Sequence, residues 1–250
     1  MAVVTLAPDA AVSWTAHDFE PYAIQRHLGG RVTLLPLYIG SLGPDLLTKW
    51  YIYGISLFGV EIRADNPAFF HRGWPGAGFT HSPFFALAVA LVVYLILRNG
   101  VWAFSLGLGL CAHAVTDILD TNGTMLLFPF SLERISVGAW AYAGELGRRV
   151  DGFAYYGSLG LVADLAALAL ALFSWRVLRR DYFESRVLPR DPVLRFAGRF
   201  LPSEALLAVH RFGFVFGLSR LTAWLLFVYV LHSNPLDLSW GGPSWVPALE

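Results

Sequence analysis

The apolar stretch at residues 107–131 contains polar residues whose spacing could support chemistry. His113 and Asp117 are four residues apart, so on a helix they share one face, and Asp120, three residues further on, continues that face. An ionised carboxylate in hydrocarbon costs at least about 2.5 kcal/mol, so such residues point inward and mark a functional site by default. The alternative is a His–Asp hydrogen bond that joins two helices.

Two further histidines flank the glycine-rich segment "HRGWPGAGFTHSPFF", just before an apolar run. Thr80 or Ser82 can cap a helix that begins at Pro83, which would fix His81 at its start. Together with His113 and Asp117, His71 and His81 would form a nitrogen and oxygen ligand set that suits Zn²⁺ or a similar first-row ion. Taken alone, loop histidines such as these are more often solvent-exposed or cap-related residues than metal ligands.

Asp45 is the third candidate, because Gly43 and Pro44 precede it and predict a helix break that would display its carboxylate. An ion pair with Lys49, four residues on, is the structural alternative. Asp164 also lies inside an apolar run, and we expect a structural partner for it, such as Arg220. We expect the remaining histidines to lie at the surface: His17, His27, His210 and His232.

The composition indicates an integral membrane protein, in which transmembrane helices would position these residues. Hydrophobic residues make up 56% of the 250-residue chain and charged residues only 14%. The formal net charge is zero, so nothing indicates nucleic-acid binding. Cys111 is the one cysteine, so a metal must be held by histidine and carboxylate. Backbone groups in lipid must be satisfied within each segment, and no strand-like alternation occurs, so the fold is expected to be all-α.

We predict a polytopic helical bundle of four to five spans in a single membrane domain, residues 1–250. A span needs about 20 apolar residues. Four stretches reach or approach that length, and a fifth, interrupted by glycine and proline, is expected to be a broken or re-entrant helix; in chain order the five are 33–60, 80–98, 101–119, 155–178 and 213–232.

The distribution of arginine predicts the orientation of the bundle. Seven arginines lie between Arg176 and Arg199, so this connection between the last two spans should be cytoplasmic, as should Arg26, Arg31 and Arg98. Residues 132–154 are expected to form an amphipathic interfacial segment. The aromatic tail, residues 233–250, is too poor in apolar residues to span.

Several short motifs in order resemble the bacterial inner-membrane, metal-dependent hydrolases of the YdjM type. The resemblance covers residues 40–131, and Leu47 stands where that family has a second acid after the Pro-Asp step. Six residues, rather than one, separate the two histidine motifs. The matching pieces are "PD" from Pro44, "HRG" from His71, "THS" from Thr80, "HAVTD" from His113 and "GTMLLFPFS" from Gly123. The resemblance implies a helical inner-membrane protein with metal-ligand residues.

Two hypotheses from different classes follow. The first is a bacterial inner-membrane, multi-pass hydrolase that holds one divalent ion, Zn²⁺ or similar, and acts at the lipid–water boundary on a lipid or phosphoester. Its predicted metal ligands are Asp45, His71, His81, His113 and Asp117, with Asp120 as general base or as a residue that orients a histidine. The second is a non-catalytic subunit of a larger membrane complex, with the aromatic tail docked on a partner. A transporter that uses Asp45 and Asp164 is disfavoured, because no inverted repeat is visible.

Overall fold

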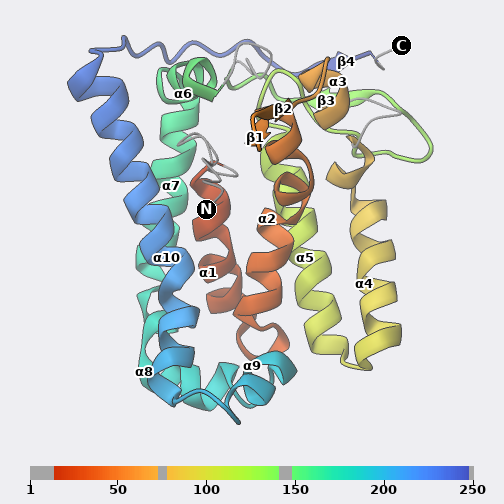
Figure 1. Cartoon of the computed structure of the whole chain (residues 1–250), viewed down its shortest axis with the longest axis vertical. Coiled ribbons are helices and arrows are strands. Elements are labelled where there is room, and N and C mark those ends of the chain that lie inside the picture. Colours follow the sequence, from red (N-terminus) through yellow and green to blue (C-terminus); the bar gives the residue numbers. More distant parts are fainter. Residues whose placement is uncertain (1–13, 73–77, 141–147, 248–250) are drawn as a thin grey trace.

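The computed structural model describes residues 14–72, 78–140 and 148–247, and these residues are mostly helical (Figure 1). Five long helices run roughly side by side: α1 (Ala16–Leu28), α2 (Leu34–Ile52), α5 (Gly100–Asp117), α7 (Leu159–Phe173) and α10 (Ser203–Leu225). α4 (Pro83–Leu97) packs on the outer side of α5. The all-α prediction is therefore confirmed, apart from two short two-stranded sheets.

Short elements connect these helices at the two ends of the bundle. At the end with α3 lie β1 (Ile55–Leu57), β2 (Val60–Ile62), α3 (Pro67–Arg72), η2 (Gly78–His81), β3 (Arg134–Ser136), α6 (Arg148–Tyr156) and β4 (Ser244–Val246). At the other end lie η1 (Gly29–Arg31), η3 (Trp175–Leu178), α8 (Arg180–Tyr182), the π-helical η4 (Phe183–Val187) and α9 (Pro192–Ala197). The π-helical η5 (Leu226–Leu231) continues α10.

Helix α1 lies in the middle of the bundle, between α2, α7 and α10 (Figure 1). Its first turn is held by Asp164 of α7, a fully buried carboxylate that accepts hydrogen bonds from the Thr15 hydroxyl and the Ala16 amide. The hydroxyls of Tyr155 and Tyr156 donate to the same carboxylate. Four donors thus compensate a buried charge that would otherwise be costly.

The structural role expected for Asp164 is confirmed, but Arg220 is not its partner. Arg220 of α10 donates instead to Asp18 of α1, at 2.8 Å between Nη1 and Oδ2, and Tyr38 also donates to Asp18. Asp164 accepts hydrogen bonds from neutral donors only, and the positive charge of Arg220 on α10 instead balances the carboxylate of Asp18 on α1. The polar pairs therefore fasten α1 to α7 and to α10 separately.

Helices α2 and α5 approach each other most closely at Gly40 and Gly109. A Cβ added at Gly40 would lie 2.8 Å from the amide nitrogen of Leu110, and one added at Gly109 would lie 2.9 Å from that of Ser41. Only glycine permits this backbone contact, as at other small-residue helix crossings. The crossing fixes Asp45 of α2, five residues after Gly40, against His113 of α5, four residues after Gly109.

The predicted break in α2 is wrong, because the helix continues from Leu34 to Ile52 with Pro44 inside it. A proline removes one backbone hydrogen bond and crowds the preceding turn, but the packing of α2 on α5 outweighs this cost. Asp45 is nevertheless displayed to the neighbouring elements, because its face of α2 is turned toward α5 and α3.

Among the described residues, one helix is long and apolar enough to cross a bilayer: Ser203–Leu231, formed by α10 and η5. A second span exists if α6 and α7 are taken together, although they meet at 77°. Ser158 caps the start of α7 at this bend, with its hydroxyl accepting from the Gly160 amide. The span count of four to five therefore stays a prediction.

The aromatic tail folds back on its own chain. β4 pairs antiparallel with β3, with Ile135 opposite Trp245, and the Trp240 indole donates to the Val137 carbonyl. The region predicted as interfacial contributes β3 and α6, and its residues 141–147 lie outside the described part. The tail is thus part of the end of the molecule that bears α3.

Candidate metal centre

Three separate segments bring two acids and two histidines together in the interior. Asp45 of α2, His81 of η2, and His113 and Asp117 of α5 are all buried, and one ligand atom from each lies within 4.8 Å of the others. Asp117 Oδ2 is 3.5 Å from His81 Nε2 and 3.2 Å from His113 Nε2. Asp45 Oδ1 is 3.8 Å from each of these nitrogens. Four of the five residues predicted as metal ligands thus lie together, whereas His71 is not part of this group, and their role as ligands stays a prediction.

These distances fit one small divalent ion. Bonds of about 2.0–2.1 Å in a tetrahedral zinc site place neighbouring ligand atoms about 3.4 Å apart. The four carboxylate–imidazole separations, 3.2–3.8 Å, bracket that value, and all the ligand atoms lie within 4.8 Å of one another. A carboxylate pair with two imidazoles is also a donor set that first-row ions accept. The four side chains thus match a metal in spacing and in chemistry.

The two imidazoles of the group are oriented as metal-ligating imidazoles usually are. His113 Nδ1 lies 2.6 Å from the Ser41 carbonyl, and His81 Nδ1 lies 3.0 Å from the Thr80 hydroxyl. A ring that donates from Nδ1 to a carbonyl presents an unprotonated Nε2. Neither Nε2 forms a hydrogen bond with any residue that the structure describes.

His71 lies beside the four-residue group, and its imidazole is hydrogen-bonded differently from those of His81 and His113. Its Nδ1 accepts from the Arg72 Nε–H at 3.2 Å, so its Nε2 carries the proton and donates to Asp45 Oδ1 at 3.0 Å. Burial, together with Lys49 and Arg72, lowers the pKa of His71 well below its ordinary value. The Lys49 ammonium is 3.6 Å from the same Asp45 oxygen, so the ion pair considered as an alternative exists within the site.

Arg72 contacts two acids: Asp117, the last residue of α5, and Asp120, which lies just beyond that helix. Its Nη2 lies 2.7 Å from Asp117 Oδ2 and 3.0 Å from Asp120 Oδ2. The other oxygen of Asp120 accepts from the amides of Asn122 and Gly123. Burial raises the pKa of Asp120 to about 6 against the opposing charge of Arg72. Asp120 is therefore adjacent to the four-residue group and engaged on both oxygens; its role as general base stays a prediction.

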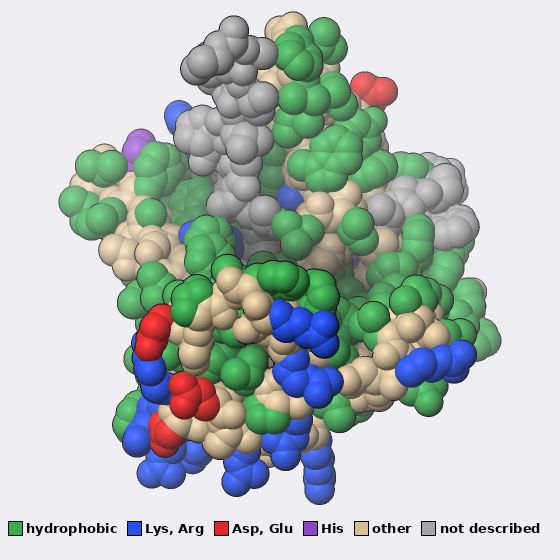
Figure 2. All heavy atoms as spheres, turned by 60° about the horizontal axis from the view of Figure 1, so that its bottom comes forward, with side chains coloured by type: hydrophobic (Ala, Val, Ile, Leu, Met, Phe, Trp, Pro, Cys, Tyr) green, Lys and Arg blue, Asp and Glu red, His purple; other side chains and the backbone are tan. Residues whose placement is uncertain are grey.

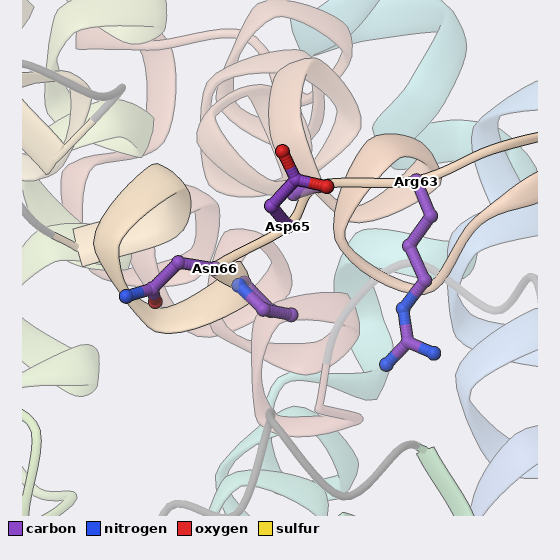
Figure 3. A pocket seen from close by; sticks show the side chains of 5 residues that line it. Arg63, Asp65 and Asn66 are labelled. Atoms are coloured by element: carbon purple, nitrogen blue, oxygen red, sulfur yellow. The ribbon is translucent and has the colours of Figure 1, made fainter.

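An open pocket lies at the start of α3, the helix that ends with His71 and Arg72. It has a volume of about 460 Å³ and is lined by residues 63–67. Figure 3 shows Arg63 and Asn66 on opposite sides of it. His71 is four helical residues beyond Pro67, or about 6 Å along the axis. The pocket thus offers polar side chains close to the candidate centre.

The sequence prediction missed His17, which was expected at the surface. His17 is fully buried on α1, its ring stacks on that of His113 with centroids 4.2 Å apart, and its Nε2 is 3.2 Å from Asp117 Oδ1. Its Nδ1 lies 3.6 Å from Glu20 Oε2, and Glu20 also accepts from Thr116. The one available signal was Thr15-x-x-Asp18, a capping-box pattern that predicts a helix start just before His17. His210 is buried as well, against the prediction, whereas His27 and His232 are exposed as expected.

We expect His17→Ala to weaken divalent-ion binding by about 10–100-fold, because a partner that orients a metal ligand typically has this effect. A competition titration with a chromophoric chelator measures it. His17→Gln, which keeps a donor toward Asp117, should recover part of the loss. His27→Ala, an exposed histidine on the same helix, is the control and should bind as the unmodified chain does. Equal affinity for His17→Ala and His27→Ala would show that His17 does not support the site.

Comparison with known proteins identifies the family. A family model described as "YdjM inner membrane protein" matches residues 4–183, which is more than half of the chain and includes α1 as well as the four-residue group. Among curated proteins and solved structures, no match was found. The match extends well beyond residues 40–131, where the motifs first indicated a resemblance, and it shows that the chain belongs to the YdjM inner membrane protein family.

Proposed function

We propose that this chain is a membrane-bound hydrolase that uses one divalent metal ion, Zn²⁺ or similar. The observation that carries the proposal is the buried group of Asp45, His81, His113 and Asp117, whose ligand atoms lie within 4.8 Å of one another. Acids and imidazoles that converge in an apolar interior without such a purpose would be costly to bury.

The protein side chains prepare the site in distinct ways. His71 donates to Asp45, and Arg72 and His17 hold the two oxygens of Asp117, so both acids are fixed before anything binds. Asp120 orients Arg72. A bound divalent ion would lower the pKa of a water molecule toward about 7 and polarise a phosphoryl or acyl oxygen. The elements that surround the group exclude bulk water, which strengthens electrostatic interactions there.

The surroundings favour an amphiphilic substrate. The candidate centre lies toward the α3 end of the bundle, and the pocket lined by Arg63 and Asn66 lies at the start of α3. Large apolar side chains are exposed along the outer faces of the neighbouring helices, including Leu87 and Ile96 of α4. A substrate with a polar head and an apolar tail satisfies both surroundings. We therefore propose a lipid or a lipid-linked phosphoester.

The same exposed apolar surface supports a multi-pass location in the inner membrane. On α7 Phe173 is 81% exposed, and on the α10 and η5 helix Val215 and Val230 are more than half exposed. Side chains of this kind face lipid rather than water in a membrane protein. We propose four to five crossings.

Metal removal tests the proposed function. The full chain is purified in mild detergent without added metal and is analysed for its elemental content, which should show about one divalent ion per chain. Release of phosphate or alcohol from detergent-solubilised lipid phosphoesters should cease after chelation and return on adding Zn²⁺. A chain that contains no stoichiometric ion and gains none on adding Zn²⁺ would contradict the proposal.

The non-catalytic alternative draws no support from the tail. Its strand β4 and Trp240 are bonded to β3 and Val137 of the same chain, so the aromatic residues there have an intramolecular role. A fixed partner recovered from native membranes, together with an ion-free chain, would favour that alternative.

A further inference from the structure

A cluster of arginines lies at the end of the molecule remote from the candidate metal centre. Figure 2 shows basic side chains gathered over this end, where α8 and α9 lie, and because Lys49 is buried beside Asp45 these are arginines. A surface pocket of about 510 Å³ opens there, and four arginines line it: Arg26 of α1, Arg176 of η3, Arg179 between η3 and α8, and Arg186 of η4. This pocket is called the arginine pocket below.

Most of the charge in the arginine pocket is not neutralised by the protein. Asp181 also lines it and pairs with Arg179 at 2.9 Å. Within the described part of the chain, no carboxylate lies within ion-pair distance of Arg26, Arg176 or Arg186. Three guanidinium groups held around one hollow repel one another unless an anion joins them. The pocket is therefore complementary to an anionic ligand.

The base of the arginine pocket is fixed by hydrogen bonds between distant segments. Buried Gln25 donates to the carbonyls of Gly29 and Val32 and to the Tyr182 hydroxyl, and that hydroxyl donates to the Gln25 carbonyl. The end of α1 is thus tied to α8. Arg26 directly follows Gln25, so hydrogen bonds between separate segments hold the backbone on this side of the pocket.

The position of the pocket selects a lipid as the source of the anion. Trp175, next to Arg176, is 53% exposed, and the Arg179 guanidinium lies over its ring at 5.6 Å. Phe173, at the end of α7, is 81% exposed. An aromatic ring at a helix end followed by arginine marks the boundary between hydrocarbon and headgroups. A ligand in this pocket therefore has its anion at headgroup depth.

We propose that the arginine pocket binds the phosphodiester headgroup of an anionic phospholipid. Guanidinium groups pair with phosphate oxygens in a bidentate manner, and basic pockets between helices on the cytoplasmic side suit such headgroups. The acyl chains would lie along the exposed apolar face beside Phe173. This site is independent of the proposed hydrolase function, because it lies at the opposite end of the bundle.

Native mass spectrometry of the full chain in detergent tests the proposal. Phosphatidylglycerol should bind one site per chain at least about tenfold more tightly than phosphatidylcholine, which carries the same phosphate in a zwitterionic headgroup. A triple variant with Arg26→Gln, Arg176→Gln and Arg186→Gln should bind phosphatidylglycerol at least about tenfold more weakly, since each basic residue contributes separately. Metal content should be unchanged.

The control removes the same charge from the same end of the molecule. The control is a triple variant with Arg98→Gln, Arg195→Gln and Arg199→Gln. These three arginines lie outside the pocket, so this variant should change phosphatidylglycerol binding by less than about twofold. Equal losses in the two triple variants, or equal binding of the two lipids, would overturn the proposal. Inorganic phosphate that displaces phosphatidylglycerol at low millimolar concentration would instead identify a soluble anion. If the glutamine variant does not fold, the corresponding lysine variant keeps the charge but loses bidentate pairing, and a loss of affinity there still supports the site.

Discussion

The double variant His113→Ala, Asp117→Ala should retain no stoichiometric divalent ion. Two of the four ligand atoms disappear, and Asp117 is also the acid that contacts His17, His81 and Arg72. Loss of two ligands should weaken metal binding more than loss of a residue that only orients a ligand. We therefore expect the affinity for the divalent ion to fall by more than about 100-fold. Elemental analysis and a chelator competition measure the loss, and hydrolysis should disappear with it.

Two further variants separate metal loss from misfolding. Asp117→Asn keeps the shape of the side chain and removes its charge, so it should also fail to hold the ion while remaining folded. His210→Ala is the matched control, because His210 is a buried histidine whose Nε2 pairs with the Val177 carbonyl, away from the site. It should keep one ion per chain. A stoichiometric ion in the double variant would remove the assignment of these ligands.

Alanine at Gly40 or Gly109 should destabilise the protein and disrupt the candidate centre together. The added Cβ would lie less than 3.0 Å from backbone atoms of the facing helix, which cannot move aside as a side chain can. Overpacking typically costs about 1–3 kcal/mol and more where backbone must shift. Separation of α2 from α5 also moves Asp45 away from His113, so metal affinity should fall with stability.

Gly43→Ala provides the control for these variants on the same helix. A Cβ there would meet only the Leu110 Cδ2 at 3.5 Å, an ordinary contact, and alanine is a better helix former than glycine. Thermal unfolding in detergent should therefore show no loss for Gly43→Ala and a clear decrease for Gly40→Ala and Gly109→Ala. If all three variants unfold alike, the close crossing is not what holds the site together.

Local spacing was sufficient to predict much of the candidate site. The four-residue interval between His113 and Asp117 places both on one face of α5, and the cap at Ser82 holds the start of α4 next to His81, as the sequence indicated. Helix periodicity and capping depend on neighbours in sequence, so they can be read directly. The contact of these residues with Asp45 followed from the motifs of the family rather than from geometry.

Contacts between distant segments could not be predicted from local patterns. Nothing near His17 shows that α1 enters the centre of the bundle, because the carboxylate that holds its first turn is 148 residues away, on α7. The partner of Arg220 was misassigned for the same reason, since Asp18 and Asp164 are both acids buried near α1. Pro44 shows the opposite limit: a strong local signal for a break is overridden by packing on α5.

The way α1 is held has a consequence for biosynthesis. Its acid Asp18 meets Arg220 only after about 200 further residues have been made, and its first turn meets Asp164 only when α7 exists. Until then the Asp18 carboxylate lacks the cation that balances its charge in the folded chain. Helix α1 can therefore take its final place only after α7 and α10 have been synthesised.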